Sequence, residues 1–365
     1  MAETAHECEN REIHRRHHEV GDDTPAAIRL ESLGYSYRGS ISRGTGRDHS
    51  TASADAALDG VSLDVAAGEI FGVLGPNGSG KTTLFRILAT MMRPTHGRAS
   101  VFGDDVAGRP HQVRAQLGVV FQQPSVDLKL TAWENMIHQG RLYGLRGPEL
   151  RERAGMLLER FGLLDRRRDL IETFSGGMRR RLEVAKAMLH DPCLLLLDEP
   201  ETGLDPAGRR DLWKLLESVR AQRNVTVALT THLMEQAQRC DRLAILNRGR
   251  LIALDSPAGL TGRIGAPVIR IEPATGQDAG QLRDAIEQRF GPWTEGAVPT
   301  LVGGTIRLQN AKGAAFAVEL SAAFGERIQS TTIGRATLED VFLHLTGHTL
   351  LGDARRGEAL RHEGT

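Results

Sequence analysis

The chain has 365 residues, a length that predicts roughly two domains at about 150 residues each. Its 46 lysine and arginine residues balance its 46 aspartate and glutamate residues, which argues against a nucleic-acid-binding protein driven by net positive charge. Hydrophobic residues make up 40% of the chain and charged residues 25%, and these shares exclude global disorder.

The first part of the chain changes character twice. Residues 1–25 are polar and lack hydrophobic periodicity, so we expect a disordered arm. From Ile28 to about Leu254, apolar runs of strand length alternate with helical periods, which predicts a parallel sheet covered by helices. Residues 39–57 are rich in Ser, Gly and Ala and are expected to form a long surface loop. We therefore predict an α/β domain over residues 26–255.

A glycine-rich segment follows the apolar strand predicted at residues 70–74. Helical periodicity begins directly after the segment, so the GxxxxGK[ST] pattern stands in the strand, loop, helix context of a phosphate-binding loop. Glycines let backbone N–H groups turn toward phosphate oxygens, and the helix N-terminus favours an anion. Lys81 is expected to contact the β and γ phosphates, and the Thr82 hydroxyl suits Mg²⁺. The alternative is a glycine-rich turn that binds nothing. The predicted nucleotide-binding residues here are Gly75, Pro76, Asn77, Gly78, Ser79, Gly80, Lys81, Thr82 and Thr83.

Residues 130–173 carry no strand signal and indicate a helical insertion in the α/β domain. One helix face is formed by Leu150, Ala154, Leu157, Leu158 and Phe161, and another by Trp133, Met136, Ile137 and Gly140.

Two carboxylates, Asp198 and Glu199, follow the buried-strand run at residues 194–197. A strand in the same sheet as residues 70–74 would deliver both side chains beside the phosphates. Asp198 is then expected to hold Mg²⁺, and Glu199 to accept a proton from the attacking water. The alternative is that the two carboxylates merely cap the next element. Together with the glycine-rich loop they indicate nucleoside triphosphate hydrolysis.

The region after Ser256-Pro257 is predicted to form a small α+β domain over residues 256–350, with a tail at 351–365. Strand alternation, a glycine hairpin and helical periods support this, and Thr337 opens a capping-box pattern before the last helix. The expected elements are a strand at 268–271, helices at 282–290 and 314–324, the Gly303-Gly304 hairpin and a helix from 337 to 345.

Further motifs appear in a fixed order along the α/β domain. Phe174-Ser175-Gly176-Gly177-Met178 precedes a helix, about twenty residues before the acidic strand end. These residues resemble the signature sequence of ATP-binding cassette (ABC) ATPases. The remaining elements of that family also have counterparts in this sequence, namely Gln122 for the Q-loop, Gly203-Leu204-Asp205-Pro206 for the D-loop and Thr230-Thr231-His232 for the switch histidine.

The resemblance implies a fold and a mode of action. The fold is α/β, a P-loop NTPase of the ABC cassette type, with a RecA-like core and a helical subdomain at about 124–175. In the family, two cassettes stack head to tail, so this chain is expected to form a homodimer in which Ser175, Gly176 and Gly177 contact the γ-phosphate held by the other copy. Asp205 is also expected near the nucleotide. The implied cofactors are ATP and Mg²⁺.

The resemblance also assigns roles to three single residues. His232 is expected to touch the γ-phosphate and to orient the attacking water together with Glu199, and Gln122 to sense Mg²⁺ and water. Tyr37 stands where the family stacks an aromatic ring on adenine, with Tyr35 as the second choice. A tyrosine with a core or surface role is the alternative, because residues 39–57 lengthen the usual spacing.

We expect that the chain itself does not cross a membrane, so that any membrane-spanning partner is a separate chain. No stretch approaches the roughly 18 apolar residues that cross a bilayer, and the N-terminus lacks an apolar signal sequence. Cys8, Cys193 and Cys240 form no CxxC pair, which indicates a reducing compartment. We therefore expect a cytoplasmic protein. The resemblance to the ABC family implies that it docks on a membrane-spanning permease subunit through residues around 124–143, where Trp133, Met136 and Tyr143 serve either docking or core packing.

Subfamily resemblance suggests the direction of transport. The sequence resembles the ATP-binding subunits of ABC-2-type exporters, including the daunorubicin-resistance type, which move drugs, lipids or polysaccharides outward. The alternative is a soluble ABC ATPase that acts on DNA or ribosomes, although the chain has neither a second cassette nor a long coiled coil. The residues that carry this resemblance are 118–127, 178–183 and 336–342.

Overall fold

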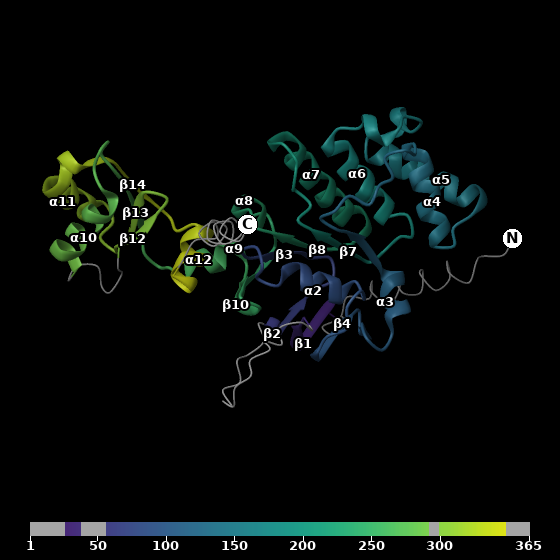
Figure 1. Cartoon of the computed structure of the whole chain (residues 1–365), viewed down its shortest axis with the longest axis horizontal. Coiled ribbons are helices and arrows are strands. Elements are labelled where there is room, and N and C mark those ends of the chain that lie inside the picture. Colours follow the sequence, from purple (N-terminus) through teal and green to yellow (C-terminus); the bar gives the residue numbers. More distant parts are fainter. Residues whose placement is uncertain (1–25, 38–55, 292–298, 348–365) are drawn as a thin grey trace, which may run out of the picture. The chain divides into compact units, whose positions relative to one another are not determined.

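The computed structural model describes residues 26–37, 56–291 and 299–347. The expected arm at 1–25, residues 39–55 of the expected loop and the tail at 351–365 lie outside the described residues. The described residues form two compact units, divided between Leu254 and Asp255 (Figure 1).

A six-stranded sheet forms the centre of the first unit, in the order β10-β9-β3-β8-β7-β6. β3 pairs in parallel with β8 and β9, and β7 pairs in parallel with β6 and β8, which confirms the predicted parallel sheet. The leucines of β7 are buried on both faces: Leu195 and Leu197 join one core, and Leu194 and Leu196 join the other. The strands are β3 (Ile70–Leu74), β6 (Leu117–Val120), β7 (Leu194–Asp198), β8 (Thr226–Thr231), β9 (Arg242–Asn247) and β10 (Arg250–Asp255).

A second sheet in this unit corrects the prediction of a single parallel sheet. It has four antiparallel strands in the order β2-β1-β4-β5, namely β1 (Ile28–Ser36), β2 (Ala56–Val65), β4 (His96–Val101) and β5 (Asp104–Asp105). Because antiparallel sheets can leave one face in water, β1 alternates buried and exposed residues along its first half. The expected loop at 39–57 is also too long at its end, since Ala56 and Ala57 already belong to β2.

Helices cover the sheets of the first unit. α2 (Lys81–Leu88) lies between the two sheets (Figure 1), and α3 (Pro110–Gln116) precedes β6. The predicted helical insertion is confirmed: the expected face from Leu150 to Phe161 is buried in one core with Met136. The remaining helices are α4 (Ala132–Leu142), α5 (Gly147–Arg160), α6 (Gly176–Ala187), α7 (Pro206–Arg223) and α8 (Met234–Ala237), with 3₁₀ turns at Leu164–Arg166 and Ile171–Thr173.

The second unit is an α+β domain, as predicted, and its strands and helices alternate as β-α-β-β-α-β. The antiparallel sheet has the order β12-β13-β11-β14, and α10 and α11 supply core residues such as Ile286 and Phe316 against its apolar face. The elements are α9 (Pro257–Gly262), β11 (Val268–Pro273), α10 (Ala279–Phe290), β12 (Thr300–Val302), β13 (Thr305–Gln309), α11 (Ala314–Phe324), a 3₁₀ turn (Gly325–Arg327), β14 (Ile328–Gly334) and α12 (Leu338–Thr346).

Two further features of the described residues concern membrane-spanning helices and cysteines. Within the described ranges, no helix has the length and apolar character needed to span a bilayer. Cys193 and Cys240 are free and buried, and burial raises the pKa of the Cys193 thiol to about 12. Both thiols are therefore protonated and unreactive at neutral pH.

Candidate active site

The glycine-rich loop joins the end of β3 to the start of α2, as the motif predicts. Gly78 and Gly80 have φ values of 80° and 102°, in the region that favours glycine. A Cβ atom on Gly80 would lie 2.3 Å from the carbonyl oxygen of Ala57, so a side chain at this position would collide with the backbone of β2. Glycine at position 80 is therefore required both by the backbone conformation of the loop and by its close approach to β2.

Lys81 is the first residue of α2, and its side chain folds back onto the backbone of this loop. Its Nζ donates to the carbonyl oxygens of Gly75 at 2.7 Å and Pro76 at 3.0 Å, and it lies 3.6 Å from Glu199 Oε1. Burial lowers the pKa of Lys81, and the negative charge of Glu199 opposes this shift. The ammonium group is thus held at the loop where an anionic phosphate would be neutralised.

Asp198 ends β7 beside the start of α2. Its Oδ1 accepts from the Thr82 hydroxyl at 3.3 Å and from the Thr230 hydroxyl at 2.6 Å. Hydroxyl and carboxylate oxygens are the ligands that Mg²⁺ prefers. The donor set formed by Thr82 and Asp198 therefore suits that ion.

Glu199 is almost fully buried and has a positive φ of 46°, so its side chain leaves the strand end in a constrained direction. Gln122 Nε2 donates to its Oε2 at 3.3 Å, and His232 Nδ1 lies 3.4 Å from the same oxygen. The contact with His232 lowers the pKa of Glu199 although burial opposes this, and the same contact raises the pKa of His232. Glu199 is therefore a charged base flanked by two polar side chains.

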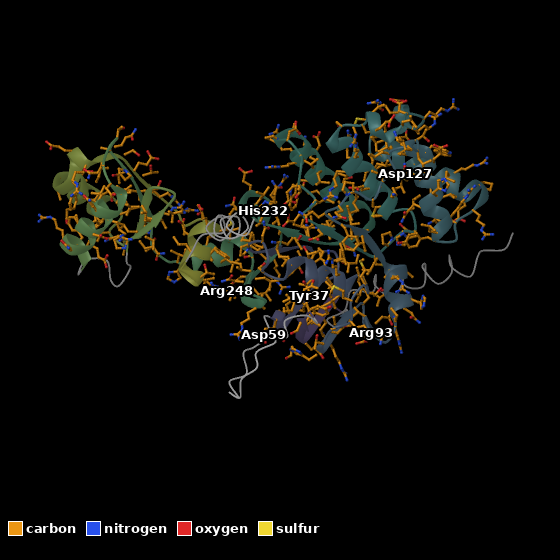
Figure 2. The ribbon with its side chains drawn as sticks, viewed as in Figure 1. Tyr37, Asp59, Arg93, Asp127, His232 and Arg248 are labelled. Atoms are coloured by element: carbon orange, nitrogen blue, oxygen red, sulfur yellow. The ribbon has the colours of Figure 1, made fainter. Side chains whose placement is uncertain are left out.

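Lys81, Glu199 and Gln122 line one cleft of about 460 Å³, whereas Asp198 and His232 lie behind its lining and are reached through Thr82 and Glu199. Of the predicted loop residues, Gly75, Pro76 and Ser79 are also not among the lining residues. Tyr37, labelled in Figure 2, directly follows β1, lines this cleft and is half exposed. Its hydroxyl is 3.0 Å from Thr83 Oγ1. Tyr35 packs against the core and meets Tyr37 edge to face, with ring centroids 5.0 Å apart, so the ring available to a ligand is Tyr37. The cleft is lined by Tyr37, Ala57, Asn77, Gly78, Gly80, Lys81, Thr82, Thr83, Gln122 and Glu199.

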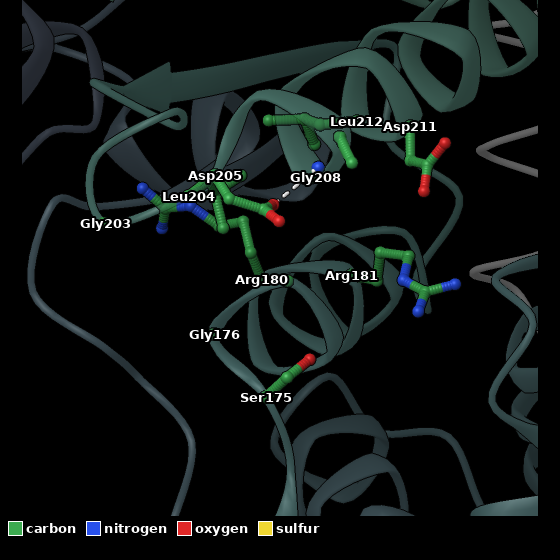
Figure 3. A pocket seen from close by; sticks show the side chains of 12 residues that line it. Ser175, Gly176, Arg180, Arg181, Gly203, Leu204, Asp205, Gly208, Asp211 and Leu212 are labelled. Atoms are coloured by element: carbon green, nitrogen blue, oxygen red, sulfur yellow. Dashed lines mark hydrogen bonds between the residues drawn. The ribbon is translucent and has the colours of Figure 1, made fainter.

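The predicted signature residues line a different cleft of about 350 Å³ (Figure 3). Ser175 caps α6 and accepts from the Met178 N–H at 3.3 Å, while Asp205 caps α7 and accepts from the Gly208 N–H at 2.8 Å. Gly176 and Gly177 lie on the first turn of α6 beside Ser175. Among the described residues, the two clefts share no lining residue. One chain thus does not bring its signature residues to its own glycine-rich loop.

Sequence reasoning missed three side chains that organise the site. Thr230 contacts both acidic residues, because its hydroxyl also accepts from the Glu199 N–H at 2.9 Å. Arg180 binds the backbone carbonyls of Pro200 and Glu199 at 2.8 and 3.0 Å. Glu201 is buried and accepts from the Thr231 hydroxyl. Thr230 could have been found from its position two residues before His232, whereas Arg180 carries no comparable signal. The sequence marks Glu201 only as a negative charge added next to the acidic pair, near the expected dimer interface, and does not predict its burial.

Of the three side chains considered for docking, Met136 is fully buried, so the structure supports core packing for it. Trp133 is partly buried and packs against the same core. Tyr143 is also partly buried and stacks flat on His190, with ring centroids 3.7 Å apart. Because Trp133 and Tyr143 keep exposed surface, docking stays a prediction for these two residues.

Comparisons with known proteins agree with this geometry. Residues 58–202 match the family model described as ABC transporter. The chain is 40% identical over 294 residues to the daunorubicin/doxorubicin resistance ATP-binding protein DrrA of Streptomyces peucetius, covering 80% of this chain and 88% of that protein. It is 36% identical over 332 residues to the Nod factor export ATP-binding protein I of Rhizobium johnstonii, covering 90% and 98%.

Solved structures show the same fold. A dimeric post-hydrolysis state of an ATP-binding cassette bound to ADP and Pi aligns with a TM-score of 0.54 at 26% identity, covering 63% of this chain and 98% of that chain. Another, cbiO1 from Clostridium perfringens, aligns with a TM-score of 0.57 at 24% identity, covering 73% and 97%. The second comparison supports the fold alone.

Proposed function

Because the chain belongs to the daunorubicin-resistance-like family of ABC transporter ATP-binding subunits, we propose that it drives export by hydrolysing ATP in the cleft that contains Lys81 and Glu199. The observation that carries this proposal is the position of Glu199, 3.6 Å from the loop lysine and 3.4 Å from His232. A charged carboxylate at that point can accept a proton from water beside a bound γ-phosphate.

The nucleotide is held by the glycine-rich loop and Tyr37. The backbone N–H groups of the glycine-rich loop and the Lys81 ammonium would surround the phosphates, and the Tyr37 ring would stack on adenine, because Tyr37 and the loop line the same cleft. Thr82 and Asp198, with Gln122 beside them, would hold Mg²⁺, which when bound neutralises phosphate charge. Lys81 supplies a further positive charge from the protein itself.

Glu199, Gln122 and His232 form the hydrolytic group. Glu199 keeps its charge because its pKa is lowered by contact with His232. Gln122 and His232 both approach Glu199 Oε2, so they orient this oxygen and the water that it activates. This arrangement positions water and base before the reaction, which is the main catalytic task in phosphoryl transfer.

Two copies of the chain complete the site. Ser175, Gly176 and Gly177 lie at the N-terminus of α6, where backbone N–H groups attract an anion, and they are separated from the chain's own loop. A head-to-tail homodimer brings this helix end to the γ-phosphate bound by the other copy, with Asp205 at the same interface. The dimeric state of a similar cassette supports this arrangement.

We expect the transported molecule to be a drug, a lipid or a polysaccharide, the classes implied by the resemblance to ABC-2-type exporters. The relatives carry the names of a drug-resistance protein and an export protein, so a soluble ABC ATPase acting on DNA or ribosomes is not favoured. We place the chain at the cytoplasmic face of the membrane, bound to a membrane-spanning permease subunit. Isolation of the chain from native detergent extracts should recover that permease, and recovery without any membrane protein would contradict the transport function.

The decisive experiment compares the wild type with Glu199→Gln. The ATPase rate per wild-type chain should rise with protein concentration, while Glu199→Gln should lose turnover and form an ATP-dependent dimer in size exclusion. Glu217→Gln is the matched control, because Glu217 is an exposed acid paired with Arg239. A rate that is independent of concentration, from a monomer, would overturn the dimer mechanism.

A further inference from the structure

Three charged side chains project from successive turns of α6, the helix that begins with the signature residues. Arg180, Glu183 and Lys186 are all buried, with exposed fractions of 6%, 4% and 8%. Burial of charged side chains is costly unless each is paired. The groups to which these three side chains bind therefore indicate what the side chains do.

Arg180 binds the backbone on both sides of the contact between Gln122 and Glu199. Its Nη1 donates to the Phe121 carbonyl at 3.0 Å, and its Nη2 donates to the Glu199 carbonyl at 3.0 Å. Its Nε donates to the Pro200 carbonyl at 2.8 Å. One guanidinium thus fixes the residue before Gln122, Glu199 itself and the residue after Glu199.

Glu183 and Lys186 hold the other end of the Gln122 loop, which we define as residues 121–125. Glu183 accepts from Arg180 Nη1 at 2.9 Å and from the Ser125 N–H at 2.6 Å. Lys186 Nζ donates to the Ser125 carbonyl at 2.6 Å. The loop is therefore attached to α6 at both ends, while its central Gln122 reaches Glu199 Oε2.

We propose that Arg180 and Glu183 are positioning residues that hold Gln122 and Glu199 in hydrolytic geometry and tie them to the signature helix of the same chain. Arg180 and Arg181 leave α6 in different directions (Figure 3), and only Arg180 makes these contacts. When the N-terminus of α6 engages the nucleotide of the second copy, Arg180 transmits the position of the helix to the chain's own base. This inference rests on the proposed function.

Two substitutions test this role, one by changing the shape of the side chain and the other by changing its charge. A lysine at position 180 keeps the charge, but it lacks the planar fork that reaches several carbonyls at once. Glu183→Gln keeps the shape but removes the negative charge beside the guanidinium. Arg179→Lys is the matched control, because Arg179 lies on the same helix and binds the carbonyls of Ile171 and Glu172 instead.

The experiment measures kcat, KM for ATP and equilibrium ATP binding for Arg180→Lys, Glu183→Gln and Arg179→Lys. The two positioning variants should lose about tenfold or more in kcat, because small misplacements of catalytic groups are costly. Their KM and ATP affinity should stay within about twofold of the wild type, since neither residue lines the cleft around the glycine-rich loop. Arg180 also lines the signature cleft, but its guanidinium is bound to carbonyls of its own chain. In a Glu199→Gln background, Arg180→Lys should still form the ATP-dependent dimer.

The outcomes separate this inference from the proposed function. A wild type without ATPase activity would contradict the proposed function, whereas an active wild type with equally active Arg180→Lys and Glu183→Gln variants would overturn only this inference. Parallel loss of ATP binding and kcat would also overturn it, because that pattern indicates general structural damage. If Arg180→Lys does not fold, the kcat and ATP affinity of Glu183→Gln decide the matter.

Discussion

The hydroxyl of Thr230 donates to Asp198 Oδ1 at 2.6 Å and accepts from the backbone N–H of Glu199 at 2.9 Å. The contact follows from sheet register, because Asp198 and Thr230 are paired residues on the neighbouring strands β7 and β8. A single side chain on β8 therefore orients the Asp198 carboxylate and fixes the backbone from which the Glu199 side chain departs.

Replacing Thr230 with valine should reduce kcat by about tenfold, because the variant keeps the β-branched shape but leaves both acidic residues less constrained. Unfolding stability should fall by about 1 kcal/mol through the lost hydrogen bonds. The matched control is Thr226→Val on the same strand, where the hydroxyl accepts from the Gly68 N–H at 2.9 Å, far along the strand from the acids. Steady-state kinetics and thermal unfolding of both variants give the comparison. Equal kcat values for the two would contradict the role of Thr230.

The contact between His232 and Glu199 predicts a pH-dependent contribution to stability. The pKa of His232 is raised by Glu199, so the protonated imidazole stabilises the fold fully below its ordinary pKa of about 6.5, and this contribution disappears as the pH rises through the raised value. The contribution should stay below about 1 kcal/mol because solvent screens a histidine that is about one third exposed.

The melting temperatures of the wild type and His232→Gln should therefore differ most at about pH 6 and below, and converge as the pH rises above the raised pKa of His232. The same substitution in a Glu199→Gln background should show a much smaller pH dependence, because the negative partner is absent. A difference that is constant between pH 6 and 9 would mean that the two side chains are not electrostatically coupled.

Glu201 also predicts a stability that falls as the pH rises, here because its charged form is disfavoured in the folded state. Burial raises its pKa, so the folded state binds a proton more readily than the unfolded state, and this group destabilises the fold increasingly as the pH rises above the ordinary pKa. Glu201→Gln removes the charge and keeps an oxygen that can accept from Thr231. Its melting temperature should exceed that of the wild type at pH 8, and the gain should shrink toward pH 5. If the gain in melting temperature were the same across this range, or absent, burial of Glu201 would not disfavour its charged form.

The sequence predicted those parts of the site that depend on local pattern. The glycine-rich loop needs positive φ at Gly78 and Gly80, and the run of leucines in β7 needs burial on both faces, so both leave a clear signature. The sequence does not identify which strands pair with one another, because the alternation of buried and exposed residues in β1 is compatible with more than one sheet. The antiparallel sheet and the first residues of β2 were accordingly missed.

Long-range polar contacts could not be predicted from spacing. Arg180 lies 19 residues before Glu199 and 59 residues after Phe121, and only the packing of α6 against β6 and β7 brings their atoms together. An arginine on a helix is usually a solvated side chain, so its type alone gave no reason to single it out. In the second unit, by contrast, the capping box at Thr337 was predicted because it is local, and the structure confirms it.

That capping box also has a long-range role that leads to a last prediction. Asp340 accepts from the Thr337 N–H at 2.8 Å and is almost fully buried, while Arg270 and Arg307 donate to its two oxygens at 2.6 and 3.1 Å. Asp340→Asn removes the charge that neutralises both arginines and should destabilise the second unit by about 2 to 3 kcal/mol.

Calorimetry of the whole chain should show this loss, whereas ATP affinity should remain unchanged because Asp340 lies outside the nucleotide cleft. Asp284→Asn is the matched control, since Asp284 is exposed and pairs with its neighbour Arg283, and it should change stability by less than about 0.5 kcal/mol. If Asp340→Asn were as stable as the control, the two arginines would be held in place by other contacts, and the anchoring of α12 to the sheet through Asp340 would be disproved.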